Sequence, residues 1–375
     1  MAIEKVVLVL VELTTRKGFL IDEELEEMVE LIRSANGDVV AAVQVKLFRP
    51  NASLFIGAGK VEEIAQQLLE TGARRVVFNQ NLSPVQTRNL EMQLKKHKAK
   101  VIDRNLLILD IFARRAKSSD GKLQVELAQL EYQLPRVDMQ WEKLSRAAGG
   151  GAGAMGGQGE QQIEIDRRRI RERIIRVKKE LLKLKEHRAR LRAGRKQKQF
   201  VQAVLVGYTN AGKSTLLNAL TGAEAYAMDQ LFATLDPKTR LFQDGRIGSI
   251  LVTDTVGFIR DLPHHLVEAF HATLEEVTEA DAVIHVIDVS NPNTLEQVKV
   301  VEKVLASLKA SEKPTIFALN KSDLLTPEQK KMWLSEFPDS ICISAKKKEG
   351  LRELMQKVKD VLAEYNRQTR ASKSA

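Results

Sequence analysis

The stretch FVQAVLVGYTNAGKSTLLNAL, residues 200–220, decides the fold of the second half of the chain. Its apolar beginning predicts a buried strand, and its end has the spacing of a helix. Between them lies G-x-x-x-x-G-K-S, a loop whose backbone N–H groups surround phosphates, whose lysine neutralises β and γ oxygens, and whose serine binds Mg²⁺. The stretch therefore predicts a P-loop domain in which Lys213 is catalytic and Ser214 is a metal ligand. Nucleotide contacts are expected from Gly207, Tyr208, Thr209, Asn210, Ala211, Gly212, Lys213, Ser214 and Thr215.

A second phosphate-facing element follows the apolar strand SILVTD. It is the tetrapeptide DTVG, made of Asp254, Thr255, Val256 and Gly257. A carboxylate at a strand end holds the metal, usually through a water, while the glycine N–H faces the γ-phosphate. The tetrapeptide is weak in isolation, but a nucleotide-dependent switch needs it at this place after the P-loop. We expect Asp254 to be a metal ligand and Gly257 to act in catalysis.

The loop FATLDPKTR, between these two elements, offers a switch threonine. Such a threonine completes the magnesium shell with its hydroxyl and meets the γ-phosphate with its N–H. Because Thr239 begins the strand TRLFQ, we expect Thr234 to be the catalytic, metal-binding residue. A structural capping role for Asp236 is the alternative use of this loop. The expected nucleotide contacts are Phe232, Ala233, Thr234, Leu235 and Asp236.

The tetrapeptide NKSD, which follows the strand PTIFAL, predicts a guanine site. A carboxylate at Asp323 accepts hydrogen bonds from N1–H and the 2-amino group of guanine, and adenine offers no matching pair. Asn320 would bind the base or tie its loop to the P-loop, and the Lys321 stem would cover the purine. A turn with a helix cap at Asp323 is the alternative. The contacts expected here are Asn320, Lys321, Ser322 and Asp323.

The tripeptide SAK follows the strand SICI and completes the set. The Ala345 N–H would donate to guanine O6, and Lys346 would cover the base. Ser344, Ala345 and Lys346 are the expected contacts. Alone this tripeptide has no meaning, but four elements in this order, each at the end of a strand, predict GTP binding with Mg²⁺.

Upstream, residues 1–120 alternate apolar strands with amphipathic helices, which predicts a parallel α/β domain. One helix is expected to begin after Ser83 and to run through the KKHK run that ends at Lys98. FIGAGK, residues 55–60, lacks the full P-loop spacing, and we interpret it as a turn before a helix. We assign no chemistry to this domain.

Residues 121–198 change period, because apolar side chains recur four and three residues apart in two successive segments. Two such segments predict an antiparallel two-helix coiled-coil hairpin with a glycine-rich tip at 149–159. Between residues 160 and 198, sixteen Lys or Arg stand against six Asp or Glu, a surplus that equals the net charge of +10 of the whole chain. Nucleic acid is the first partner for such a stripe, and an ordinary solvated helix face is the alternative. We expect the tip to enter an RNA site while the arginines hold phosphates.

Composition limits the remaining possibilities. The chain is 43% hydrophobic and only 5% aromatic, which is typical of globular domains. Cys342 is the single cysteine, so an internal disulfide is excluded and a reducing compartment fits. No apolar run is long enough to span a bilayer. We expect a cytoplasmic protein, a monomer without stable membrane insertion.

With these residues in hand, the chain resembles the HflX family of translational GTPases. The resemblance rests on GYTNAGKST, FATLDP, DTVGFIRDLP, NKSD, SAK and the glycine-rich GGAGAMGGQGE, and it covers nearly the whole chain. It implies an α/β domain at residues 1–120, a helical hairpin at 121–198, a Ras-like G domain at 199–366 and a polar tail at 367–375. It also implies association with the large (50S) ribosomal subunit and its rRNA, and a role in splitting or rescuing stalled ribosomes or in ribosome biogenesis. Some relatives carry a further carboxy-terminal domain.

Phe258 stands where a Ras-type enzyme has the glutamine that orients the attacking water. A phenyl ring neither donates nor accepts such bonds, so hydrolysis is expected to be slow alone and to be stimulated by ribosomes. Asn210 adds the hypothesis of a K⁺ ion beside the phosphates, as in related asparagine-bearing GTPases, with a bond to a neighbouring loop as the alternative. Two other functions stay open: a nucleotide-stabilised RNA-binding module, and a peripheral membrane regulatory GTPase.

Overall fold

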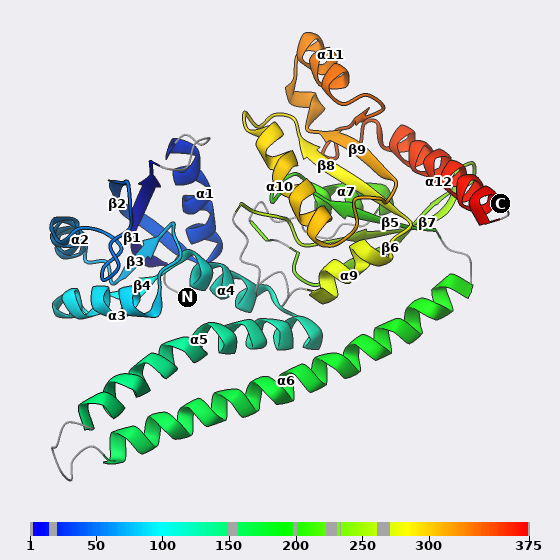
Figure 1. The fold of residues 1–375 in the computed structure, drawn as a ribbon. Coiled ribbons are helices and arrows are strands. Elements are labelled where there is room, and N and C mark those ends of the chain that lie inside the picture. The colour runs from blue at the N-terminus through cyan, green and yellow to red at the C-terminus, as the bar shows by residue number, and fades with distance from the viewer. Residues whose placement is uncertain are drawn as a thin grey trace. The chain divides into compact units, whose positions relative to one another are not determined.

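A computed structural model describes residues 3–14, 21–148, 157–197, 201–222, 231–232, 234–260 and 271–373 (Figure 1). The chain divides into two compact units. The first comprises Met1–Arg114 and Lys122–Leu181, and the second comprises Arg115–Gly121 and Leu182–Ala375.

The first unit contains the predicted parallel α/β domain. Its sheet has four parallel strands in the order β2-β1-β3-β4. The strands are β1 (Glu4–Leu13), β2 (Gly37–Leu47), β3 (Arg75–Phe78) and β4 (Lys100–Ile102). The helices are α1 (Ile21–Ser34), α2 (Ala58–Thr71), α3 (Pro84–Gln93) and α4 (Arg104–Arg115). Side chains alternate between the faces of β1, and Val7, Val9 and Val11 pack with residues of α2 and α3 on one of them.

Helix α3 begins as expected and ends earlier. Ser83 caps it through a capping box with Gln86, and Pro84 occupies its first turn. The expected continuation through Lys98 is wrong, because a separate 3₁₀ turn covers Lys95–His97 and Lys98 itself is left-handed, with φ 51°. In the FIGAGK segment, Gly57 directly precedes α2, so the segment is a turn before a helix.

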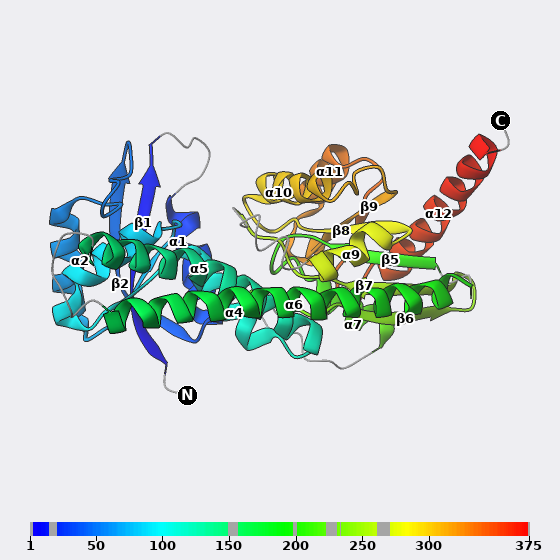
Figure 2. The same cartoon turned by 60° about the horizontal axis from the view of Figure 1, so that its bottom comes forward.

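Two long helices follow, α5 (Ser119–Ala148) and α6 (Gly157–Gln197). They lie side by side and run in opposite directions in both views (Figure 1 and Figure 2). Ion pairs link them at Asp138–Arg167 (2.6 Å), Glu126–Arg173 (2.6 Å) and Glu131–Lys178 (2.8 Å). Most of the predicted tip, residues 149–156, lies outside the described residues. Its last three residues are not loop, because α6 already begins at Gly157.

The second unit contains a six-stranded sheet in the order β10-β9-β8-β5-β7-β6, in which β6 alone is antiparallel to its neighbour. Its strands are β5 (Val201–Val206), β6 (Lys238–Asp244), β7 (Gly248–Asp254), β8 (Ala282–Asp288), β9 (Thr315–Asn320) and β10 (Ile341–Cys342). Its helices are α7 (Lys213–Thr221), α9 (His271–Glu279), α10 (Thr294–Ser307), α11 (Pro327–Glu336) and α12 (Leu351–Lys373).

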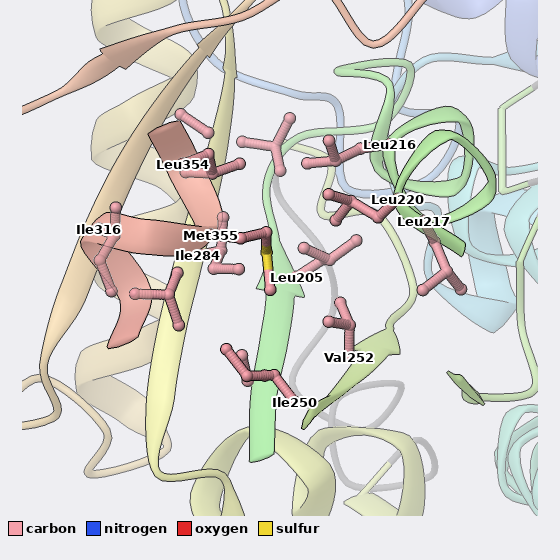
Figure 3. Close-up of a cluster of buried hydrophobic side chains, with 14 of the residues drawn as sticks. Leu205, Leu216, Leu217, Leu220, Ile250, Val252, Ile284, Ile316, Leu354 and Met355 are labelled. Carbon is pink, nitrogen blue, oxygen red and sulfur yellow. The ribbon is translucent and has the colours of Figure 1, made fainter. Parts of the chain in front are cut away.

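Helices cover both faces of this sheet with their apolar side chains. On one face Leu205 and Ile284 of the strands pack with Leu216 of α7 and Met355 of α12 (Figure 3). On the other face, side chains of α9 and α10 pack against β5 and β8. A parallel sheet that is covered on both faces binds ligands outside the carboxyl ends of its strands. The loops that follow β5, β7 and β9 lie there, and they carry three of the predicted motifs. No helix among the described residues is long and apolar enough to cross a membrane.

Candidate nucleotide-binding site

The P-loop joins β5 to α7 and wraps around its own lysine. The Lys213 ammonium donates to the carbonyls of Gly207 (3.0 Å) and Tyr208 (2.6 Å). Gly212 has φ 92°, a conformation that favours glycine, and a Cβ there would collide with the Asn320 amide. Burial lowers the pKa of Lys213 to about 8, although Asp254 opposes that shift. An anion placed in this loop would favour the charged ammonium and raise that pKa.

Three side-chain oxygens from separate segments meet beside this lysine, two of them buried and that of Ser214 half-buried. The Ser214 hydroxyl lies 2.9 Å from the Thr234 hydroxyl and 2.7 Å from Oδ2 of Asp254. The Thr234 hydroxyl donates to the same Oδ2 at 2.8 Å. Oδ1 of Asp254 is buried and has no hydrogen-bond partner among the described residues. Burial raises the pKa of this carboxyl, although its bonds to both hydroxyls oppose the shift.

This arrangement fits a magnesium ion. An octahedral Mg²⁺ with bonds of about 2.1 Å places neighbouring oxygen ligands about 3 Å apart, close to the separations of these oxygens. Hydroxyl and carboxylate oxygens are hard donors of the kind that Mg²⁺ prefers. No group of three His, Cys, Asp or Glu side chains in the described part of the chain could hold a metal, so the two hydroxyls are essential to the fit.

The threonine loop, residues 231–237, and the strand after it place the two candidate threonines differently. The Thr239 hydroxyl lies 2.9 Å from that of Thr253 on the neighbouring strand, so it is engaged away from the three oxygens. Phe232 and Leu235 are buried, and Ala233 lies outside the described residues. Asp236, expected as a nucleotide contact, accepts the backbone N–H groups of Lys117 and Ser118 instead. The loop thus holds Thr234 beside Ser214 and Asp254, and it holds Asp236 in a structural contact.

The DTVG segment lies directly on the P-loop. A Cβ at Gly257 would stand 2.9 Å from Cα of Thr209 and 3.0 Å from the Lys213 ammonium, so only glycine allows this approach. The Thr255 hydroxyl donates to the Leu205 carbonyl at 2.7 Å and therefore ties β7 to β5. Val256 is buried. Of this tetrapeptide, Asp254 and Gly257 border the site, whereas the side chains between them belong to the core.

Phe258 has a structural role, which could not be inferred from the observation that its side chain is apolar. Its ring is 1% exposed and packs with Val206, Leu274 and Val277. Its carbonyl accepts the Thr209 N–H (2.8 Å), and its own N–H donates to Gly207 (3.1 Å). The residue therefore anchors the DTVG segment to the P-loop and the core. A hydrophobic residue directly after DxxG was the only sequence signal for this role.

The base-recognition loops are cross-linked by Asn320. Its amide donates to the Ala211 carbonyl (2.7 Å) and its Oδ1 accepts the Ala345 N–H (3.0 Å). Asn320 thus ties the NKSD loop both to the P-loop and to SAK. The Ala345 N–H, which we expected at guanine O6, is already engaged in this way.

Asp323 lies beside Ser344 and has Lys347 at 3.8 Å. A hydrogen bond from Ser344 lowers the pKa of Asp323, so this carboxylate stays ionised at neutral pH. Lys321 pairs with Asp288 at 2.6 Å, and Lys346 is exposed. Sequence analysis missed Asp288, whose position directly at the end of β8 was the available signal.

Comparisons with known proteins agree with this geometry. Three protein-family models match in succession: GTP-binding GTPase N-terminal at residues 22–113, GTP-binding GTPase Middle Region at 115–195, and 50S ribosome-binding GTPase at 202–321. Over 96% of its length the chain is similar to a solved GTP-binding protein from Sulfolobus solfataricus in complex with GDP, with 26% identity and a TM-score of 0.51. A structure named as an SsGBP and GDP complex has 28% identity and a TM-score of 0.53, and the match covers 96% of this chain and 99% of that one.

Curated relatives share most of their length with the chain. GTPase HflX of Caldanaerobacter subterraneus subsp. tengcongensis is 48% identical over 339 residues, which are 90% of this chain and 76% of the relative. GTPase HflX of Escherichia coli K12 is 41% identical over 362 residues, which are 96% of this chain and 83% of the relative. Identity of this extent, with the P-loop, DTVG and NKSD in place, shows that the chain belongs to the HflX family of GTP-hydrolysing enzymes.

Proposed function

We propose that this GTPase uses the state of its nucleotide to control association with the large ribosomal subunit, and that it splits or rescues stalled ribosomes. The observation that carries the nucleotide part is the contact of Ser214, Thr234 and Asp254 beside Lys213. Thr234 belongs to a different loop from Ser214 and Asp254. A bound Mg²⁺ would therefore order the Thr234 loop only while Thr234 is one of its ligands.

In this proposal each residue has a stated task. Lys213 and the N–H groups of residues 207–214 neutralise and hold the phosphates. Ser214, Thr234 and Asp254 hold Mg²⁺, Asp254 through a water or directly, and the ion would neutralise charge that develops on the phosphates. The Gly257 N–H meets the γ-phosphate, and Asp323 recognises guanine. K⁺ at Asn210 is part of the proposal too, supported by the exposure of that residue beside the loop.

Residue 258 supplies no polar side chain to the phosphates, because the ring of Phe258 is in the core. We therefore propose slow hydrolysis in isolation and faster hydrolysis on the ribosome. Phosphoryl transfer depends mostly on positioning and on charge neutralisation, so an external group, or a loop ordered by the partner, is sufficient to raise the rate.

Helix α6 supports the ribosomal part. Several of its cations are engaged within the protein, for example Arg173 with Glu126 and Lys178 with Glu131. Others are exposed and have no ion pair with any described residue: Arg176, Lys179, Lys183 and Arg190. Their spacing of three, four and seven residues places them along one face of the helix. Such a row suits RNA phosphates, and the ribosome-binding description of the matched GTPase family favours rRNA as the partner.

A co-sedimentation assay with purified 50S subunits tests this proposal. The protein is compared in its empty state, with GDP and with a non-hydrolysable GTP analogue. We expect tight binding only with the analogue, and faster GTP turnover when subunits are added. Equal pelleting in all three states would favour an RNA-binding module with a structural nucleotide. Flotation with anionic vesicles, in competition with rRNA, would reveal a membrane regulator.

Two charge-reversal variants distinguish a specific role of the exposed cations of α6 from an effect of the overall charge of the protein. Changing Arg176, Lys179 and Lys183 to Glu should weaken 50S binding by about tenfold or more and reduce its salt dependence. The matched control changes Lys95, Lys96 and Lys98, which are also exposed, to Glu. Equal losses in both triple variants would contradict a specific role of the α6 row. Splitting activity is then measured by light scattering on intact 70S ribosomes.

A further inference from the structure

The carboxylate of Asp236 makes an unusual set of contacts for a residue of a switch loop. Its Oδ2 accepts the backbone N–H groups of Lys117 (3.0 Å) and Ser118 (2.9 Å), and its Oδ1 accepts the Ser118 hydroxyl. These donors immediately precede α5, more than a hundred residues earlier in the sequence, and they belong to the same compact unit as Asp236. Several donors on one carboxylate, at the positive end of a helix, make a strong and directional contact.

The first turn of α5 is shaped to receive this carboxylate. The Ser118 hydroxyl also accepts the Gly121 N–H at 2.9 Å, so Ser118 caps the helix while it donates to Asp236. A Cβ at Gly121 would collide with Oδ1 of Asp236. Glycine in a helix disfavours the helix, so the absence of a side chain here serves the approach of the carboxylate.

A second contact joins the same turn to the helix that follows the DTVG region. Asp120 forms an ion pair with Arg188 of α6, and Arg188 also reaches Glu275 of α9 at 3.4 Å. Lys185 contacts the other oxygen of Glu275 at 3.1 Å. Glu275 is only 5% exposed, so these pairs are poorly screened by solvent. The turn at residues 117–121 therefore touches the threonine loop directly and α9 through Arg188.

We propose that the first turn of α5 is a positioning element for GTP hydrolysis. Only Leu235, which is buried, separates Asp236 from Thr234. By holding Asp236, the turn keeps the Thr234 hydroxyl against Ser214 and Asp254, where it completes the ligand set for Mg²⁺. Ser118, Gly121 and Asp236 position the loop and do not touch the reacting atoms. The inference requires the GTPase reaction and is independent of the proposed ribosomal role.

Reciprocal coupling follows from this arrangement. A nucleotide that orders Thr234 also stabilises the contact between the turn and Asp236. By the same linkage, a partner that displaces the turn weakens nucleotide binding to the ordered state, by the same factor by which the nucleotide weakens binding of that partner. The turn continues directly into α5, so the coupling links the site to the long helix pair.

Single-turnover hydrolysis, measured across a range of Mg²⁺ concentrations, tests the proposal on the full chain. Asp236→Ala should lower the rate about tenfold and raise the Mg²⁺ concentration needed for half-maximal rate, because it removes hydrogen bonds to a charged group. Asp236→Asn, which retains an acceptor, should restore part of the rate. GDP affinity, which does not use the threonine loop, should change less than about twofold.

Two further variants separate positioning from stability. Gly121→Ala should slow hydrolysis although alanine favours the helix, and Ser118→Thr should retain the rate that Ser118→Ala loses. Asp244→Ala is the matched control, because that carboxylate accepts the N–H groups of Arg246 (2.8 Å) and Ile247 (3.2 Å) in a hairpin of the same unit. Unchanged rates in Asp236→Ala and Ser118→Ala would overturn the proposal. Equal effects of Asp236→Ala and Asp244→Ala on rate, Mg²⁺ dependence and melting temperature would overturn it as well.

Discussion

The parallel strands of the two sheets in this protein differ in how the edge at their carboxyl ends is occupied. In the first unit, the buried residues that follow β3 and β4 find partners in the protein. Asn79 exchanges two hydrogen bonds with the backbone of Val11, and Asp103 accepts from Leu82, Leu106 and Arg136. In the second unit, the corresponding edge leaves the hydroxyl of Thr209 and Oδ1 of Asp254 buried, with no hydrogen-bond partner in the described part of the chain. A similar architecture thus supports an edge at which Asn79 and Asp103 are bonded within the protein, and an edge at which a hydroxyl and a carboxylate oxygen stay available beside the P-loop.

Substitution of two lysines, each of which follows a glycine-containing turn at the start of a helix, gives the strongest test of the difference between the two sheets. Lys213→Ala should weaken GTP binding or turnover by about a hundredfold or more, because buried phosphates lose their cation. Lys60→Ala, the matched change in the FIGAGK turn, should leave both unchanged, since Lys60 pairs with exposed Glu63. Calorimetry with GTP and a phosphate-release assay measure both effects. A loss of binding in Lys60→Ala would show that the first unit also holds the nucleotide.

A second prediction concerns specificity at the carboxyl edge of the second sheet. Asp323→Asn should weaken GTP binding by about ten- to hundredfold, because an amide cannot accept two bonds from guanine, and should favour xanthosine triphosphate. The control is Asp339→Asn, whose carboxylate is 84% exposed. Competition titrations with GTP, ATP and xanthosine triphosphate give the ratios. Unchanged preference for guanine would assign Asp323 to its alternative role as a cap.

A third prediction compares two phenylalanines, one from each unit. Phe258→Gln should lower the free energy of unfolding of the second unit by about 3 kcal/mol and should not accelerate hydrolysis, because it buries an amide where a ring packs. Phe48→Gln, at a side chain that is 69% exposed, should change stability by less than about 0.5 kcal/mol. Urea unfolding measures both. Faster hydrolysis in a stable Phe258→Gln protein would mean that residue 258 faces the phosphates.

The smallest effect concerns pH. Burial lowers the pKa of Lys213 to about 8 in the free protein. Bound phosphate favours the charged ammonium and raises that pKa, so binding takes up a proton once the pH exceeds the free value. Affinity for GDP should be constant below about pH 8 and fall about fivefold from there to about pH 9. Calorimetry in two buffers with different ionisation enthalpies measures the proton uptake. No uptake at the higher pH would contradict the buried-lysine account.

Local sequence patterns predicted the α/β order of both sheets and the motifs of the nucleotide site. The P-loop could be predicted because its glycines and lysine lie close together in the sequence, and Thr234 was preferred because Thr239 begins a strand. The sequence left open whether Asn320 binds the base or ties its loop to the P-loop, because an amide can make hydrogen bonds in either place. The contact of Asp236 with Ser118 could not be predicted, since it joins distant segments and no local pattern encodes it. The end of α3 at Gln93, with a 3₁₀ turn and a left-handed Lys98 after it, could not be predicted, because lysine carries no signal for that conformation.

A structure of the protein with Mg²⁺ and a non-hydrolysable GTP analogue tests the central claim most directly. We predict phosphates within residues 207–214, Mg²⁺ contacted by Ser214 and Thr234 and held by Asp254 directly or through a water, and guanine against Asp323. Nucleotide density at the carboxyl edge of the first sheet alone, or a metal without Ser214 and Thr234, would contradict it.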